Sequence, residues 1–349
     1  MLIVVFFLSS GLFLGWSLGA NDAANIFGTA VGTKMVKFKT AALICSIFLI
    51  LGAVESGAGA SHTLGKLGSI NELAGAFIVA LSAALTVLWM TKAGLPVSTS
   101  QAIVGAIIGW NLFSGTHTSM SSLTKIVGTW IFSPILSAIF AFILFLLVKR
   151  IVEKSCTHML RMDMYIRIAM IIVGAFGSYS LGANNIGNVM GVFTISSPFK
   201  DITLSSFFHF SDVQQLFLIG GIAIAIGVFT YSKRVMKTVA TGIFKLNPVT
   251  GLVVVLASSI TLFLFASQGL YDFLTSHHLP AFPLVPVSSS QAVVGSVMGI
   301  SLAKGMRNLN FKKLAEISIG WVATPLASAI FSYIALFFMQ NVFMQNVYH

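Results

Sequence analysis

The chain has 349 residues, of which 56% are hydrophobic and only 8% are charged. Soluble domains carry about 25% charged residues, so this composition excludes a water-soluble globular protein and indicates an integral protein of the lipid bilayer. The net charge is +11, but the basic residues are spread through short loops and form no block of the kind that binds nucleic acid.

Five apolar runs of spanning length come first, a basic loop at 149–167 follows, and five more runs complete the chain. The first run lacks a basic leader region and a cleavage site, so we expect it to be retained as a span. The runs at 2–33 and 168–193 contain clusters of Gly and Asn, and we expect both to be broken helices. The predicted spans lie near 2–33, 40–58, 73–91, 95–113, 125–148, 168–193, 213–231, 248–267, 286–303 and 314–338.

The charge of the loops predicts how the chain is oriented. Basic residues are enriched in cytoplasmic loops, and here they follow the first, fifth, seventh and ninth runs. Three of the alternate segments, 59–72, 194–212 and 268–285, hold only Lys66 and Lys200 between them. We therefore expect a multi-pass protein with both termini outside the cell.

Two stretches of sequence recur in the same order in each half. GANDAAN at 19–25 matches GANNIGN at 182–188, and PVSTSQA at 96–102 matches PVSSSQA at 286–292. A weaker echo pairs Trp130 and Pro134 with Trp321 and Pro325. Chance repetition of small residues accounts poorly for two long motifs in matching order.

Each half of the chain holds an odd number of predicted crossings. The two halves must therefore have opposite orientations in the membrane. The predicted fold is an all-α membrane protein of two inverted-topology repeats, with broken helices and paired re-entrant or hairpin helices. The first repeat covers 1–150, a cytoplasmic linker covers 151–167, and the second repeat covers 168–349.

Two acidic residues, Asp22 and Glu55, lie well inside predicted apolar runs. A buried charge at membrane depth is costly, and such residues usually mark an ion or proton path. The alternative is a helix-end acid that reaches water, which applies more to Glu55 because it lies near the external end of its run. We predict a cation role for Asp22 and keep Glu55 as a candidate coupling acid.

The GAN motifs combine glycine, which lets a helix unwind, with oxygen-bearing side chains. Amide and carboxylate oxygens, joined by freed backbone carbonyls, are hard ligands that suit Na⁺. The alternative is that Asn and Gly merely pack the helices together. The candidate cation ligands are Asn21, Asp22, Asn25, Asn184, Asn185 and Asn188.

The PVS motifs place proline and a hydroxyl cluster where a helix would begin. A helix N-terminus offers free backbone N–H groups and the positive end of the helix dipole, so two facing termini could enclose one oxyanion. Ordinary capping without a ligand is the alternative. The candidate anion ligands are Ser98, Thr99, Ser100, Gln101, Ser288, Ser289, Ser290 and Gln291.

Neither PVS motif contains Lys or Arg, so a co-bound cation would offset the charge of the anion, and each ion would favour binding of the other. The sequence contains no catalytic constellation such as GxSxG, HExxH or a P-loop. We therefore expect a transporter that is not an enzyme and has no resident cofactor.

On these four motifs the sequence resembles the inorganic phosphate transporter (Pit) family, which includes sodium–phosphate cotransporters. The resemblance extends from about Gly15 to Phe338. It implies import of inorganic phosphate across the plasma membrane by symport with Na⁺ or H⁺, and a scaffold part that forms a homodimer. By motif position it also implies the phosphate ligands named above and the cation ligands other than Asn185. Many members have Asp where this chain has Asn185, which leaves the number of coupled cations open.

Three alternatives to Na⁺-coupled phosphate import remain. H⁺ could replace Na⁺, with Asp22 or Glu55 titrating, and sulfate could replace phosphate, since some relatives of the family are sulfate permeases. Phosphate near neutral pH can donate a proton to a carboxylate whereas sulfate cannot, so Asp22 near the anion favours phosphate. An anion channel with re-entrant loops is a more remote reading.

Overall fold

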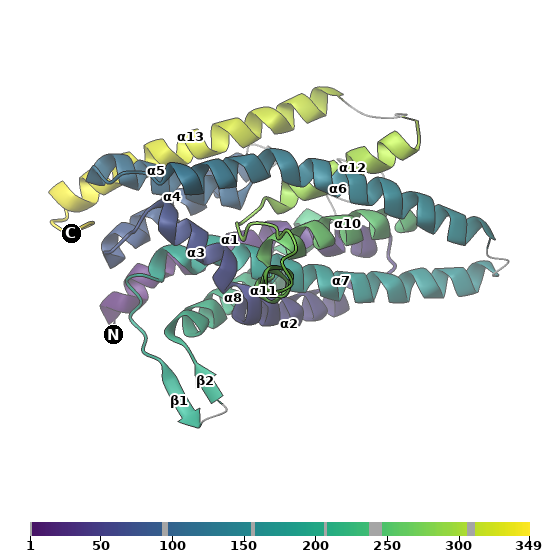
Figure 1. Ribbon diagram of the computed structural model, residues 1–349, viewed down its shortest axis with the longest axis horizontal. Coiled ribbons are helices and arrows are strands. Elements are labelled where there is room, and N and C mark those ends of the chain that lie inside the picture. The colour runs from purple at the N-terminus through teal and green to yellow at the C-terminus, as the bar shows by residue number, and fades with distance from the viewer. Residues whose placement is uncertain (1, 93–96, 155–157, 206–207, 237–245, 306–310) are drawn as a thin grey trace.

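The computed structural model describes residues 2–92, 97–154, 158–205, 208–236, 246–305 and 311–349, and within these it is built almost entirely of helices (Figure 1). The first half contains α1 (Leu2–Gly32), α2 (Phe38–Ser56), α3 (Ala58–Leu67), α4 (Leu73–Lys92), α5 (Thr99–Ser114) and α6 (Met120–Lys154). The second half contains α7 (Met159–Met190), the 3-10 turn η1 (Gly191–Phe193), α8 (Asp212–Thr230), α10 (Pro248–Ala266), α11 (Gln268–Ser276), α12 (Ser289–Ala303) and α13 (Phe311–Asn341). Between η1 and α8, strand β1 (Ile202–Ser205) pairs antiparallel with β2 (Phe208–Phe210).

Eight of the described helices are long and apolar enough to cross a membrane, and each lies at one of the ten predicted spans. The predicted runs at 95–113 and 286–303 appear instead as the shorter helices α5 and α12, which the chain enters in extended conformation at Ser98 and Ser288. Pro96 of the first PVS motif lies outside the described residues. α6 and α7 extend from either side into the predicted linker at 151–167.

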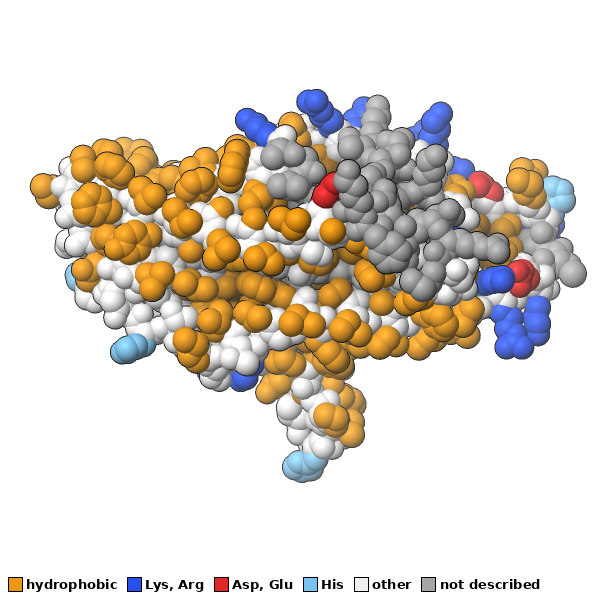
Figure 2. All heavy atoms as spheres, turned by 90° about the horizontal axis from the view of Figure 1, so that it is seen from above, with side chains coloured by type: hydrophobic (Ala, Val, Ile, Leu, Met, Phe, Trp, Pro, Cys, Tyr) orange, Lys and Arg blue, Asp and Glu red, His pale blue; other side chains and the backbone are white. Residues whose placement is uncertain are grey.

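The exterior of the protein is apolar where a soluble protein would be polar. Along α6, Ile131, Ile135, Ile139 and Ile143 form an exposed stripe at helical spacing, and α13 exposes a similar one. Figure 2 shows a broad orange band, with the Lys and Arg side chains of this face gathered mainly toward the right-hand end. A surface of this kind faces lipid, so the chain is a multi-span membrane protein.

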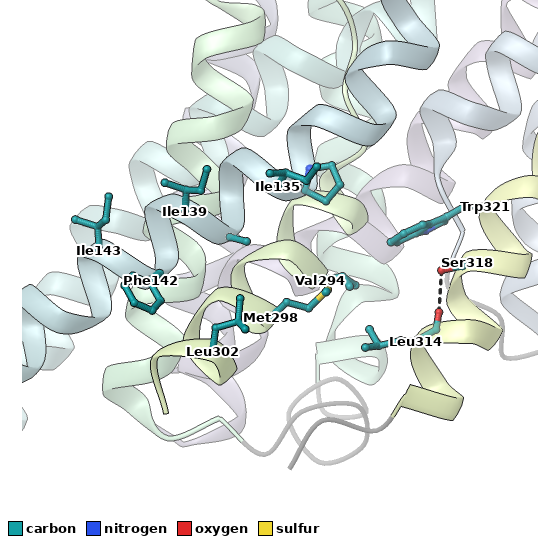
Figure 3. Close-up of a pocket in the computed structure, with 12 residues that line it drawn as sticks. Ile135, Ile139, Phe142, Ile143, Val294, Met298, Leu302, Leu314, Ser318 and Trp321 are labelled. Atoms are coloured by element: carbon teal, nitrogen blue, oxygen red, sulfur yellow. Dashed lines mark hydrogen bonds between the residues drawn. The ribbon is translucent and has the colours of Figure 1, made fainter. Parts of the chain in front are cut away.

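A groove of about 740 Å³ on this exterior lies between α6, α12 and α13. Figure 3 shows that apolar side chains such as Ile139, Phe142 and Met298 line it, and that the Ser318 hydroxyl donates back to the carbonyl of Leu314 at 3.0 Å. Its walls are almost wholly apolar and offer little to an ion. The groove is therefore part of the lipid-facing surface and is separate from the candidate site.

The packing of the two halves is mirrored. α1 packs against α8 as α2 packs against α7, and α5 packs against α13 as α12 packs against α6. In Figure 1, α1 begins at the end of the molecule where N and C are marked, whereas α7 begins at the opposite end. Exchanged partners and opposite directions are consistent with two inverted repeats.

The mirrored pairs α5–α13 and α12–α6 meet through glycine. A methyl group at Gly105 would lie 2.1 Å from the carbonyl oxygen of Pro325, and one at Gly295 would lie 2.1 Å from that of Pro134. Gly109 and Gly299, one turn further on, are as close to the partner helix, so each pair uses small residues four apart to bring two backbones together. The contact therefore places Pro134 and Pro325, which recur with the PVS motifs, at equivalent positions in the two halves.

Because of this close approach, we expect Gly295→Ala to lower the stability of the protein by about 1–3 kcal/mol, the usual range for overpacking. The measurement is the midpoint of thermal unfolding in detergent. The matched control is Gly128→Ala in α6, where an added methyl group meets no atom within 4 Å. Equal midpoints for the two variants would show that the α12–α6 contact is not tight.

The predicted breaks in the first and seventh helices are wrong. α1 continues as a helix through 19–25, and α7 continues through 182–188. The glycines provide room for a neighbouring backbone: a methyl group at Gly19 would lie 1.9 Å from the carbonyl oxygen of Ile224, and one at Gly182 would lie 2.0 Å from that of Leu49. Backbone carbonyls at these positions stay within helices, so the expected ligands from unwound backbone are not present.

Candidate functional site

The two PVS motifs form the N-termini of α5 and α12, and both are capped by serine. The Ser98 hydroxyl accepts from the backbone N–H of Gln101 at 3.3 Å, and the Ser288 hydroxyl accepts from that of Gln291 at 3.3 Å. The capping expected from the sequence is therefore confirmed in both copies. The backbone N–H groups of Thr99, Ser100, Ser289 and Ser290 have no acceptor among the described residues.

These two N-termini lie against each other. The Ser100 hydroxyl donates to the carbonyl of Val287 at 3.1 Å, and the Ser290 hydroxyl donates to the carbonyl of Val97 at 3.2 Å. Each helix start thus contacts the extended segment that leads into the other. The arrangement brings free N–H groups and the positive ends of two helix dipoles to one place inside the protein, which favours a bound anion.

The GAN motif of α7 holds one side of this cluster. Asn184 donates to the carbonyl of Val287 at 2.7 Å and accepts from its N–H at 3.0 Å, so its amide group holds the segment before α12 through two hydrogen bonds. Asn188 donates to the Ser100 hydroxyl at 2.8 Å and to Asn185 Oδ1 at 3.0 Å. Asn185 in turn donates to the carbonyl of Leu181 at 3.1 Å.

The GAN motif of α1 supplies the carboxylate. Asp22 is buried, with 8% of its surface exposed, and its Oδ2 accepts from the Ser289 hydroxyl at 2.7 Å. Asn21 is half-buried and donates to the Thr91 hydroxyl at 3.4 Å. Asn25 is also half-buried and makes no side-chain hydrogen bond with the described residues. Of the three, Asp22 therefore joins the PVS cluster directly.

Several oxygen atoms in the cluster have no partner. Gln101 Oε1, Gln291 Oε1 and Asn188 Oδ1 are buried, and none accepts a hydrogen bond from a described residue. An unsatisfied buried carbonyl is costly and calls for an explanation such as an ion. Like the Asp22 carboxylate, these carbonyl oxygens belong to residues of the GAN and PVS motifs, and such oxygens are the hard ligands that a cation such as Na⁺ requires.

Glu55 does not belong to this cluster. It is exposed at the end of α2 and lies beside Tyr179, whose hydroxyl also pairs with the Ser56 hydroxyl at 2.8 Å. The structure thus brings the PVS motifs, Asp22 and the three Asn residues of α7 together, and leaves Glu55 outside. The roles of Val97 and Val287, whose backbone joins the halves, were not predicted, although both belong to the repeated motif.

Comparison with protein families identifies the chain. A model of a family described as "phosphate transporter family" matches residues 18–277 and 278–348, which include both copies of both motifs. The chain belongs to the phosphate transporter family. Members of this family are transporters, so the protein is a transporter and not an enzyme.

Relatives in the phosphate transporter family align over nearly the whole chain. A protein of Pyrococcus abyssi is 28% identical over 92% of this chain and 94% of its own length, and one of Methanocaldococcus jannaschii is 27% identical over 95% of each. The names of both give phosphate permease as a provisional assignment. A solved structure described as "The sodium-dependent phosphate transporter" has a TM-score of 0.74, covers 97% of this chain and 99% of its own, and is 24% identical, so it shows a shared fold.

Proposed function

We propose that this member of the phosphate transporter family imports inorganic phosphate by symport with Na⁺. The observation that carries the proposal is the meeting of two helix N-termini, with free N–H groups, beside a buried set of acceptor oxygens that includes Asp22. The first feature suits an oxyanion, and the second suits a cation. Phosphate is favoured over sulfate because it can donate a proton to the Asp22 carboxylate.

The charges of the site give a physical reason for coupling. No Lys or Arg side chain takes part in the described contacts of the cluster, and its one carboxylate is negative. A phosphate ion would be repelled by Asp22 unless a cation were bound, and at low dielectric the attraction between the two ions is strong. Each ion therefore raises the affinity for the other, which is the condition for tight coupling.

The proposal includes an orientation and an assembly. On the face shown in Figure 2 the Lys and Arg side chains lie mainly toward one end of the molecule, and both chain ends lie at the other (Figure 1). With the basic end in the cytoplasm, both termini face outward from the plasma membrane. The homodimer stays a prediction, which chemical cross-linking in native membranes would test.

The proposed function is tested by uptake of labelled phosphate into proteoliposomes, with Na⁺ and pH gradients imposed separately. We expect an inward Na⁺ gradient at equal pH to drive accumulation above the external concentration, and a tenfold excess of sulfate to leave uptake unchanged. Accumulation driven by the pH gradient alone would instead show H⁺ coupling. Equilibration without accumulation would show a channel.

A further inference from the structure

A second cavity, of about 590 Å³, lies between α3, the beginning of α6, α11 and the extended segment before α12. Its lining includes His62, Lys66, Lys125, Gln268 and Tyr271, and no Asp or Glu belongs to it. We call this cavity the vestibule. In Figure 1, α3 lies in the half of the molecule that holds both chain ends, which is the outward half in the proposed orientation, and α11 lies near the middle.

The two lysines and the histidine of the vestibule are available to a ligand. His62, Lys66 and Lys125 are exposed, and none of them makes a hydrogen bond or ion pair with a described residue. Asp272 of α11 does not line the vestibule, and it accepts a hydrogen bond from Gln268 Nε2 at 3.1 Å. The vestibule therefore presents two lysines, a histidine and the Tyr271 hydroxyl, and its lining contains no Asp or Glu.

The position of these lysines runs against the charge pattern of the chain. Lys and Arg are depleted from outward-facing segments of membrane proteins, and the segments 59–72, 194–212 and 268–285 hold only Lys66 and Lys200. Lys66 nevertheless lines the same cavity as Lys125. The charge rule that orients the chain in the membrane does not account for two lysines in one outward-facing cavity.

The extended segment before α12 runs from the vestibule to the buried site. Leu284 and Val285 line the vestibule, and the Leu284 carbonyl accepts from the Thr63 hydroxyl of α3 at 2.6 Å. Two residues beyond Val285, Val287 is bound by Asn184 and Ser100 of the buried cluster. An anion in the vestibule would thus lie on the other side of the segment whose far end borders the proposed transport site.

We propose that the vestibule is a peripheral binding site for an oxyanion such as orthophosphate, where Lys66 and Lys125 collect the ion before it enters the buried site. This inference rests on the proposed function and adds an encounter step to it. A positive cavity with apolar walls raises the local concentration of an anion and its association rate by about 10-fold or more. The effect falls with ionic strength, since the Debye length shrinks from about 30 Å at 0.01 M to about 10 Å at 0.1 M.

The first test compares uptake kinetics of the wild type with the double variant Lys66→Gln/Lys125→Gln, at fixed Na⁺, with ionic strength adjusted by choline chloride. We expect the variant to raise the KM for phosphate about 10-fold at low ionic strength, with an unchanged maximal rate and a smaller difference at high ionic strength. Lys200→Gln is the matched control, because Lys200 is exposed and lies outside the vestibule. Lys66→Arg/Lys125→Arg should restore the low KM.

A wild-type KM in the double glutamine variant would overturn the vestibule site while leaving the proposed function intact. A lower maximal rate at unchanged KM would also overturn it. The absence of any wild-type uptake would instead contradict the proposed function.

The second test measures binding without transport. An amine-reactive reagent is applied from outside to oriented vesicles, with phosphate or chloride in the medium. We expect phosphate to slow the labelling of Lys66 and Lys125 several-fold and to leave Lys200 unaffected. Equal labelling of all three lysines in the two media would overturn the proposal, whatever the uptake result.

Discussion

Asp22→Asn is expected to lower the initial rate of Na⁺-driven phosphate uptake by about 10- to 100-fold. The substitution keeps the size of the side chain and an oxygen that can accept from the Ser289 hydroxyl, so it removes the charge and little else. A charged hydrogen-bonding or ion-binding group contributes about 1.5–3 kcal/mol, and each 1.4 kcal/mol changes a rate or affinity tenfold. The measurement is uptake into proteoliposomes under an inward Na⁺ gradient.

The matched control is Asp163→Asn on α7, where an exposed carboxylate pairs with Arg167 at 3.2 Å, away from the cluster. That variant should transport at the wild-type rate. Ser289→Ala, which leaves the carboxylate in place but removes its hydroxyl partner, should give a smaller loss than Asp22→Asn. Near-normal uptake by Asp22→Asn would remove this residue from the mechanism.

Gln101→Leu and Gln291→Leu are each expected to raise the Na⁺ concentration for half-maximal uptake by roughly 10- to 100-fold. The reason is that their Oε1 atoms are buried without a partner, so a bound cation would take them as ligands, and the loss of one such ligand costs about 1.5–3 kcal/mol. The KM for phosphate should change less, because these side chains affect phosphate binding only through its coupling to Na⁺ binding. The measurement is uptake as a function of Na⁺ at saturating phosphate.

Gln340→Leu provides the control for this pair. Gln340 also has a buried Oε1 without a partner among the described residues, but it lies near the end of α13 and outside the cluster. Its substitution should leave the Na⁺ dependence unchanged. A rise in the phosphate KM alone, in either Gln101→Leu or Gln291→Leu, would assign these amides to the anion and contradict a cation role.

The sequence predicts the spans of this protein well because lipid imposes one simple requirement, a long apolar helix. It does not predict α3, α11 or the β1–β2 hairpin, because these short elements are amphipathic or polar and depend on contacts with the ends of longer helices. The expected breaks at 19–25 and 182–188 failed for a related reason. Glycine serves equally to end a helix or to admit a neighbour, and only the approach of Ile224 to Gly19 decides between the two.

The candidate site was predictable to a similar degree. Repetition of the PVS and GAN motifs identifies residues that the structure places in contact, such as Ser100 with Asn188 and Ser289 with Asp22. Hydrogen bonds to backbone atoms, such as those of Asn184 with Val287, cannot be predicted from the pattern of side chains in the sequence. The sequence also does not predict the vestibule, because its lysines lie far apart in the chain and only the fold brings them to one cavity.

Asn185 makes two hydrogen bonds within the buried site. The side chain donates to the Leu181 carbonyl and accepts from Asn188, and a carboxylate could not make the first of these bonds. Its repeat partner Asp22 binds the Ser289 hydroxyl, whereas the equivalent hydroxyl of Thr99 has no partner among the described residues. The two halves therefore contribute unequally, with one carboxylate in the site.

The glycine-mediated seating of α5 on α13 and of α12 on α6 constrains biogenesis. During translation α5 enters the bilayer before α13 has been synthesised. The glycine face of α5 therefore lacks its partner helix until α13 is inserted. α6 likewise holds its surface for α12 uncovered while most of the second half is synthesised. Neither half-molecule can complete its own interior, and the ion pathway closes only after the entire polypeptide has been inserted.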